Sequence, residues 1–190
     1  KFDQIYHEHI SYFTVKNIRS LIKYSGLKMI SIKKNGYHGG SLRTVATNLN
    51  SKLKEFNPSK LIKFENEKEI YSLKFYKNMM RKINIKKINL LNKLIKLVKN
   101  GYELSGIGAG AKSNTFLTFY GLNRSIIKFL TDSSKFKQNK YTPITRIIIK
   151  DDNQLSKHKK IACLILSWNI SGIVIKKIKK INKNIKLIKT

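Results

Sequence analysis

The chain has 190 residues, with 40 Lys or Arg against 10 Asp or Glu, so its formal net charge is +30. This length has room for one domain or for one domain and part of another, and 41% hydrophobic residues exclude wholesale disorder. The single cysteine, Cys163, excludes an internal disulfide and a zinc site built from several cysteines, and a reducing, cytoplasmic setting fits this composition.

Residues 1–50 are predicted to hold one helix and two strands. Apolar side chains recur at helical spacing between residues 11 and 26, where a glycine is a natural stop. Apolar and polar residues then alternate in Leu27–Ile32 and Leu42–Ala46, as in strands with one buried face. The glycine-rich segment 36–40 between them predicts a turn. This short set of elements indicates the end of a larger unit.

Residues 51–100 are predicted to form a helical connector. After Pro58 the chain contains neither Gly nor Pro up to Asn100. Its apolar residues keep helical spacing, with one slip near Lys86 and Lys87. We expect one long helix or two helices in tandem.

Residues 101–190 alternate short apolar runs with segments of helical spacing. Parallel βαβ units are the expected result, so we predict a small Rossmann-like domain of the α/β class. Strands are expected at 102–107, 126–130, 147–149, 161–166 and 185–188, and helices at 112–121, 153–159 and 170–181. The longest apolar stretch, 161–175, is interrupted by polar residues and is too short to span a bilayer, so no membrane association is expected.

The segment Tyr6-His7-Glu8-His9 places two imidazoles, a carboxylate and a phenol in four consecutive residues. If the segment is extended, His7 and His9 face one way and Tyr6 and Glu8 the other. A solvated polar loop is one interpretation. The spacing supplies too few ligands for a metal, whereas a histidine beside a carboxylate is suited to act as a general base at neutral pH.

A glycine-rich loop, Gly106-Ile-Gly108-Ala-Gly110-Ala-Lys112, follows a predicted strand and opens a predicted helix. It satisfies the pattern G-x-G-x-x-G/A, and Asp132 lies near the end of the next strand, where dinucleotide-binding folds place a ribose-binding acid. The amides of such a helix N-terminus bind phosphate, and Lys112 adds a positive charge. The pattern indicates phosphate or nucleotide binding, and glycines that serve only tight strand–helix packing are the alternative.

Five segments, taken in order, resemble the sugar C-methyltransferases, which use S-adenosylmethionine to methylate C3 of nucleotide-linked 4-keto-deoxysugars. The segments are 2–13 with the Tyr-His-Glu-His motif, His38–Arg43, 106–115 with the glycine loop, 137–143, and 166–169 with its Ser-Trp-Asn sequence. The likeness covers nearly the whole chain. Only the connector and the extreme C-terminus are too biased in composition to compare.

In that family, a Cys-rich zinc domain and a Rossmann-type domain that binds S-adenosylmethionine precede a C-terminal Rossmann-like domain. The resemblance implies that residues 1–50 end the methyltransferase domain, that 51–100 are the connector and that 101–190 are the C-terminal domain. Zinc is then expected only in an N-terminal domain outside this chain, and the loop at 106–111 is not assigned to S-adenosylmethionine. The chain alone is expected to be inactive, with a complementary N-terminal chain as partner if the gene is split.

The resemblance also implies roles for single residues. His9 would remove the proton from the carbon next to the keto group, and the enolate formed would attack the methyl carbon of S-adenosylmethionine. Tyr6 and Glu8 would orient the sugar or polarise its keto oxygen, and His7 would support the site. The residues expected to contact the nucleotide sugar are Lys112, Asn114, Lys140, Tyr141 and Thr142, together with Gly106, Gly108 and Gly110.

Two alternatives come from other functional classes. The glycine loop also fits a nicotinamide-binding oxidoreductase module, but only 58 residues follow Asp132, too few for the second half of a dinucleotide fold. The charge fits a nonenzymatic protein that binds nucleic acid. Lys outnumbers Arg by 35 to 5, however, and Lys, Ile and Asn all have A/T-rich codons, so codon bias accounts for the charge and no specific nucleic acid is expected.

Overall fold

The computed structural model describes residues 4–36 and 40–189, which form two compact units. One unit contains residues 9–82, and the other contains the described residues of 1–8 and 83–190. His38 and Gly39, from the predicted glycine turn, lie outside the described residues. Among the helices that are described, none has the length and apolarity needed to cross a bilayer.

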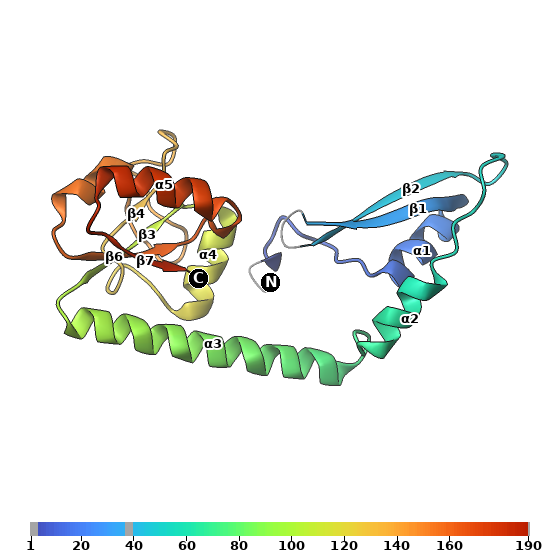
Figure 1. Ribbon diagram of the computed structural model, residues 1–190, viewed down its shortest axis with the longest axis horizontal. Helices are drawn as coiled ribbons and strands as arrows, with labels where there is room; N and C mark the ends of the chain where they lie inside the picture. The colour runs from blue at the N-terminus through green and yellow to red at the C-terminus, as the bar shows by residue number, and fades with distance from the viewer. Residues whose placement is uncertain (1–3, 37–39, 190) are drawn as a thin grey trace. The chain divides into compact units, whose positions relative to one another are not determined.

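The 9–82 unit begins with a helix packed on a two-stranded sheet (Figure 1). Helix α1 (Val15–Tyr24) is followed by β1 (Leu27–Asn35) and β2 (Ser41–Asn48). The strands pair antiparallel, with Leu27 opposite Asn48 and Asn35 opposite Ser41. The predicted order of helix, strand, turn and strand is therefore observed. Val15, Met29 and Ile32 form the small buried core between helix and sheet.

The connector consists of two helices, α2 (Ser59–Glu67) and α3 (Leu73–Lys99). The break lies at residues 68–72, and not at the slip in apolar spacing near Lys86 and Lys87, which α3 passes without interruption. Glu69 has a positive φ of 54° at the break, and Ser72 Oγ accepts a hydrogen bond from Phe75 N–H, which caps the start of α3.

The 83–189 part carries a five-stranded sheet whose strands all run parallel, in the order β5-β4-β3-β6-β7. Its central strand is β3 (Glu103–Ile107), and the others are β4 (Leu130–Thr131), β5 (Ile149–Lys150), β6 (Ile161–Ile165) and β7 (Lys186–Lys189). This is a Rossmann-like order, as predicted. The strand expected at 126–130 is mostly irregular, because the N–H groups of Ile126 and Ile127 donate to Asn123 in a turn.

Helices cover both faces of this sheet (Figure 1). On one face, α3 and α4 (Ala111–Tyr120) contribute Leu94, Leu97 and Leu117 to a core that includes Leu104 and Leu164 of the strands. On the other face lie the short 3₁₀ helix η3 (Asp152–Lys157), at a predicted α-helix, and α5 (Ser171–Ile181).

The second core contains Cys163, and its burial raises the pKa of the Cys163 thiol to about 12. A thiol held neutral in this way is an inert packing group.

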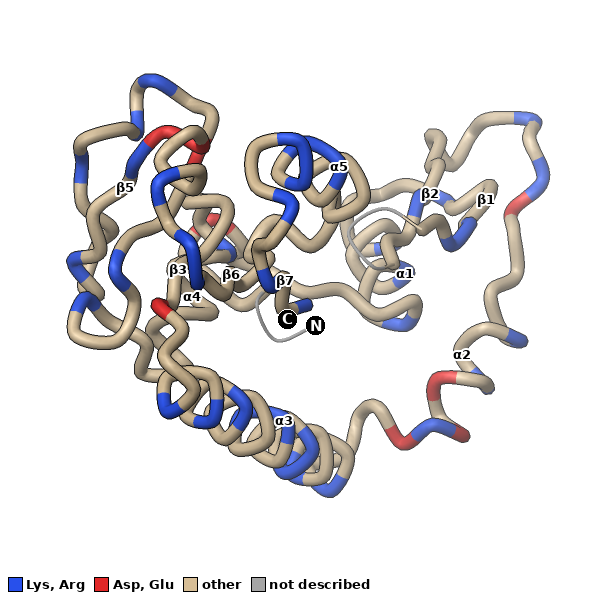
Figure 2. The backbone as a smooth tube through the Cα atoms, turned by 60° about the vertical axis from the view of Figure 1, so that its left-hand side comes forward, with Lys and Arg blue, Asp and Glu red and all other residues tan. Residues whose placement is uncertain are grey.

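Lys and Arg residues are spread along the backbone of each unit (Figure 2). The methylene groups of a long Lys or Arg side chain can be buried while its charged end contacts a polar or aromatic group. Lys87, at the predicted slip in α3, lies over the ring of Phe119 with Nζ 4.8 Å from the ring centre. The same Nζ donates a hydrogen bond of 2.6 Å to Phe119 O. A lysine at this point therefore continues the packed face of α3.

Candidate functional site

The segment Tyr6–His9 forms a bend and a turn and is not extended. Tyr6 and His9 are half-buried, whereas His7 and Glu8 are exposed, and His7 Nε2 lies 3.9 Å from Glu8 Oε1. The two-sided arrangement expected of an extended segment is therefore absent. His9 belongs to the 9–82 unit, whereas Tyr6–Glu8 belong to the second unit. The surroundings of His9 are therefore described within the 9–82 unit.

A cavity of about 720 Å³ lies within the 9–82 unit. Residues 11–13, which begin two positions after His9, and residues 40–42 at the start of β2 both line it. The ring of His9 meets the ring of Tyr12 edge to face, with centroids 6.3 Å apart. Two of the motifs found in the sequence thus converge on one cavity, whose volume is typical of sites for small molecules.

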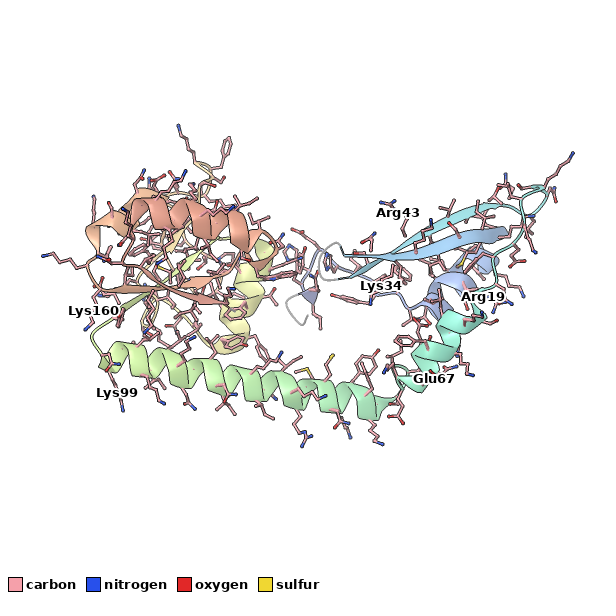
Figure 3. The ribbon with its side chains drawn as sticks, in the orientation of Figure 1. Arg19, Lys34, Arg43, Glu67, Lys99 and Lys160 are labelled. Carbon is pink, nitrogen blue, oxygen red and sulfur yellow. The ribbon has the colours of Figure 1, made fainter. Side chains whose placement is uncertain are left out.

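The walls of this cavity are mainly apolar, with three charged residues that sequence analysis did not single out: Lys34, Glu65 and Lys68. Lys34, labelled in Figure 3, lies on β1 opposite Leu42 of β2, which also lines the cavity. Glu65 Oε1 accepts a 2.8 Å hydrogen bond from Val15 N–H, and Oε2 accepts from Lys16 N–H and Tyr71 Oη. Glu65 therefore stabilises the start of α1 and fixes the segment that follows His9.

A crevice of about 280 Å³ lies in the second unit, where the carboxyl ends of β3, β4 and β6 meet. Strand order reverses around β3 at this edge, and ligands of open α/β sheets bind at such a point. The polar residues that line the crevice come from several loops and helices: Thr131, Asp132, Ser133, Lys137, Asp152, Ser167 and Lys177. The glycine loop contributes Gly108 and Gly110.

Two glycines of the loop are required by close packing. A β-carbon on Gly106 would lie 2.8 Å from Leu130 Cδ2, and one on Gly108 would lie 2.0 Å from Ser167 Oγ. Gly108 also has a φ of 98°, which side chains rarely adopt. Gly110, at the start of α4, has open space around its β-carbon position. The packing interpretation of Gly106 and Gly108 is therefore supported.

Asp132 closes the glycine loop by accepting a 2.9 Å hydrogen bond from Ala109 N–H. It also accepts from Ser134 N–H and forms an ion pair with Lys137 Nζ at 3.2 Å. Burial alone raises the pKa of this carboxyl, but the two N–H groups and the ammonium of Lys137 outweigh it, so the pKa lies below its usual value. The Ala109 amide thus already holds an anion, the carboxylate of Asp132.

Lys112 in the first turn of α4 lies over the ring of Trp168, with Nζ 5.2 Å from the ring centre. This contact joins the glycine loop to the Ser-Trp-Asn motif, which the sequence placed 56 positions later. Asn114, one residue beyond the buried Ser113, has a buried Oδ1 without a hydrogen-bond partner among the described residues. Lys112 and Asn114 therefore lie on the same short stretch of α4.

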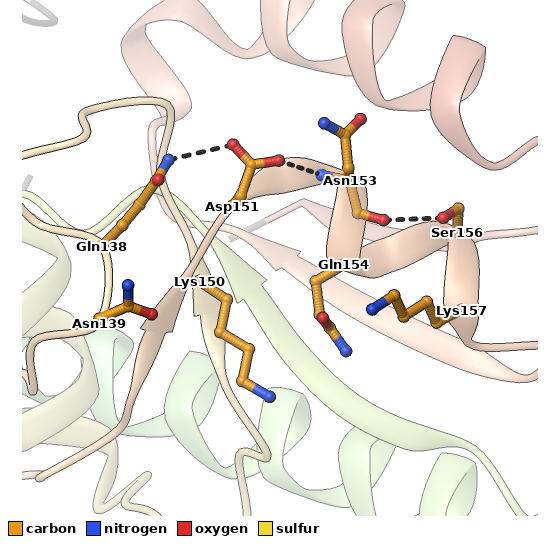
Figure 4. Close-up of a pocket in the computed structure, with 8 residues that line it drawn as sticks. All are labelled: Gln138, Asn139, Lys150, Asp151, Asn153, Gln154, Ser156 and Lys157. Atoms are coloured by element: carbon orange, nitrogen blue, oxygen red, sulfur yellow. Dashed lines mark hydrogen bonds between the residues drawn. The ribbon is translucent and has the colours of Figure 1, made fainter.

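The loop from Lys140 to Thr142 divides into two parts. Lys140 and Tyr141 are exposed, whereas Thr142 is buried, and its hydroxyl pairs with the Thr145 hydroxyl at 2.7 Å and accepts from Ile147 N–H. The Thr142 hydroxyl thus serves the fold of the loop. The preceding residues Gln138 and Asn139 line a shallow polar cavity of about 480 Å³ beside Lys150 and η3 (Figure 4).

Among residues 4–36 and 40–189, no three His, Cys, Asp or Glu residues group together in a way that could hold a metal ion. His158 Nδ1 contacts Glu103 Oε2 at 2.5 Å, far along the chain from His7 and His9.

Comparison with known proteins identifies a family relationship. A family model described as the C-methyltransferase C-terminal domain matches residues 36–188, which include β2, the connector and the five-stranded sheet except the last residue of β7. C-methyltransferase NovU of Streptomyces niveus is 27% identical over 186 residues, which are 97% of this chain and 44% of that protein. The chain therefore spans less than half the length of this curated relative.

Replacing Gly108 by Ala is expected to lower the free energy of unfolding by roughly 2–4 kcal/mol, because a strained φ adds to a clash with Ser167. Gly110→Ala is the matched control and should cost less than about 1 kcal/mol. Urea unfolding followed by the fluorescence of Trp168, the single tryptophan, measures both. Equal losses in the two variants would contradict the packing role of Gly108.

Asp132→Ala is expected to lower the free energy of unfolding by about 1–3 kcal/mol at pH 7, because Ala109 N–H loses its charged acceptor. Since the folded pKa of Asp132 is lowered, its contribution is present above the unfolded pKa and is lost as pH falls through the folded pKa. The difference between the variant and the unmodified chain should therefore shrink toward pH 2. A pH-independent difference in urea unfolding would refute this.

Proposed function

The chain belongs to the C-methyltransferase family through its C-terminal domain, and we propose that it supplies the base and part of the substrate site for methyl transfer to a nucleotide-linked keto-deoxysugar. The observation that carries this proposal is the convergence of residues 11–13 and 40–42 on one cavity next to His9. The similarity to C-methyltransferase NovU supports the type of reaction.

S-adenosylmethionine is the methyl donor expected for the family, and the glycine loop of this chain does not fit it. Gly106 and Gly108 leave no space beside the strands, and the carboxylate of Asp132 is bonded to Ala109 N–H. We assign the donor to a segment outside these 190 residues, supplied by a longer chain or by a partner chain. Methyl transfer by this chain alone is accordingly expected to be absent.

The chemistry assigned to this chain is removal of a proton. The His9 imidazole takes the proton from the carbon next to the sugar keto group. The electron pair of that C–H bond forms a C=C bond to the keto carbon, and the π pair of the C=O bond moves onto the oxygen, which gives the enolate. Tyr6 and Glu8 are assigned to orienting the sugar or polarising the keto oxygen, and His7 to supporting them. The half-buried position of His9 against Tyr12 favours this role, because the contact with the Tyr12 ring helps to orient the imidazole.

The nucleotide is assigned to the second unit, at the corner formed by Lys112 and Trp168. An ammonium held on an aromatic face retains the positive charge that attracts a diphosphate. Asn114 Oδ1, which has no hydrogen-bond partner among the described residues, adds an acceptor on the same helix. Lys140 and Tyr141 are exposed and complete this assignment. The oxidoreductase alternative has less support, because Asp132, its ribose-binding acid, is bonded to the loop itself.

Proton removal is tested by exchange, which needs no methyl donor. In D₂O, the chain should accelerate loss of the C3 proton signal of dTDP-4-keto-6-deoxyglucose in ¹H NMR spectra above the protein-free rate. His9→Gln should slow this exchange by roughly 10²-fold or more. Lys23→Gln, on the exposed side of α1, is the control and should exchange like the unmodified chain. Unchanged exchange in His9→Gln would overturn the assignment of the base.

Nucleotide contact is tested by calorimetric titration with dTDP. Lys112→Ala should weaken binding by about tenfold, which corresponds to roughly 1.4 kcal/mol. Lys159→Ala removes an exposed charge in another turn and should change affinity little. Because the contact is electrostatic, raising the salt concentration should narrow the difference between Lys112→Ala and the unmodified chain. Equal affinity in both proteins at low salt would contradict the role of Lys112.

A further inference from the structure

We propose that the crevice at the carboxyl edge of the five-stranded sheet binds an uncharged, hydroxyl-rich group of the ribose type through Asp152 and Thr131, and that it is not a phosphate site. The inference goes beyond methyl transfer, because it requires neither His9 nor a methyl donor. It rests on unsatisfied buried acceptors, on the balance of charge in the crevice and on its size.

Asp152 supplies the first acceptor. The residue is 6% exposed and lines the crevice at the start of η3. Its Oδ2 accepts a 2.6 Å hydrogen bond from Lys177 Nζ, whereas its Oδ1 is buried and has no hydrogen-bond partner among the described residues. A buried carboxylate oxygen without a donor is costly. A ligand hydroxyl would remove that cost.

Thr131 supplies a second polar atom at the same edge. It ends β4, it is completely buried, and its Oγ1 has no partner among the described residues. Because β4 and β5 pair in parallel, with Thr131 opposite Lys150, the residues that follow each strand lie at one edge of the sheet. A hydroxyl both donates and accepts. The pair of Asp152 and Thr131 thus suits a ligand with two neighbouring hydroxyl groups.

The charges of the crevice do not favour an anion. Each of its carboxylates has a lysine partner, Lys137 for Asp132 and Lys177 for Asp152. The Ala109 amide, which a phosphate would use, is bonded to Asp132. A phosphate here would face two carboxylates without a surplus cation, so repulsion would offset its attraction to α4.

Size and apolar surface limit the ligand further. The crevice holds about 280 Å³, near the lower end of the range for small-molecule sites, which suits a monosaccharide or a nucleoside. Its apolar walls come from both sides of the edge: Ile107, Ile170, Val174 and Ile178. These apolar side chains are suited to pack against the C–H groups on one face of a sugar ring.

The experiment uses the full ¹⁵N-labelled chain and follows by NMR the amides of three crevice residues outside the glycine loop, Thr131, Ser133 and Asp152. Uridine should shift these signals saturably, and 2′,3′-dideoxyuridine should bind at least tenfold more weakly. Inorganic pyrophosphate should leave these three amides unshifted, even if it binds at Lys112. Methyl ribofuranoside identifies the source: binding equal to uridine indicates a free sugar, and weaker binding indicates a nucleoside. No saturable shift with uridine or methyl ribofuranoside would overturn the proposal, as would shifts with pyrophosphate or equal binding of the dideoxy compound.

Two variants test the acceptors. Thr131→Val keeps the shape of a buried residue, and Asp152→Asn keeps the size of the side chain; each should weaken uridine binding at least fivefold. Asp151→Asn changes the exposed neighbouring acid and should bind like the unmodified chain. Circular dichroism verifies folding, and if Asp152→Asn is unfolded, Thr131→Val decides. Unchanged binding in folded Thr131→Val overturns the proposal, whereas the exchange reaction of His9 is unaffected by this outcome.

Discussion

The parallel pairing of β3 with β4 on one side and β6 on the other is the constraint on which the C-terminal unit depends. It brings three strand ends to one edge, so the loops after them must share a small space. Gly106 lies between the side chains of Leu130 and Leu166, and Gly108 lies against Ser167, with no room for a β-carbon at either position. The glycine loop therefore packs tightly against the strand ends and forms part of the crevice wall. Only at Gly110, among these three glycines, is there space for a β-carbon.

Acidic residues are few in this chain, and several of them hold structure in place. Asp132 fastens the glycine loop with Lys137, Asp152 pairs with Lys177, and Glu65 caps α1 from a helix 50 residues away. A chain of net charge +30 thus contains a crevice whose nearby charges are balanced. The net charge of the chain governs its long-range attraction of other molecules. The ligand that a site can bind depends instead on the groups within hydrogen-bond distance of that site.

Strongly periodic elements were predictable from the sequence, and elements held by other parts of the chain were not. The predicted strands 102–107 and 161–166 match β3 and β6 within one residue at each end. β6 is a continuous buried apolar run, and β3 carries the buried apolar residues Leu104 and Ile107. Of the strand predicted at 126–130, only Leu130 lies in β4, since the N–H groups of Ile126 and Ile127 donate to the carbonyl oxygen of Asn123. The helix break depends on the cap at Ser72, a signal that apolar spacing does not contain.

The order of motifs along the chain, read by itself, determined the relation to C-methyltransferases and the alternation of strands and helices, because both are properties of neighbouring residues. Tertiary structure alone decided what the motifs do to one another. It turned Asp132 onto Ala109 N–H, placed Lys112 on Trp168 and brought residues 11–13 to the same cavity as residues 40–42. These contacts join residues that are distant in sequence, and the hydrogen bonds and packing that select them exist only once the chain has folded.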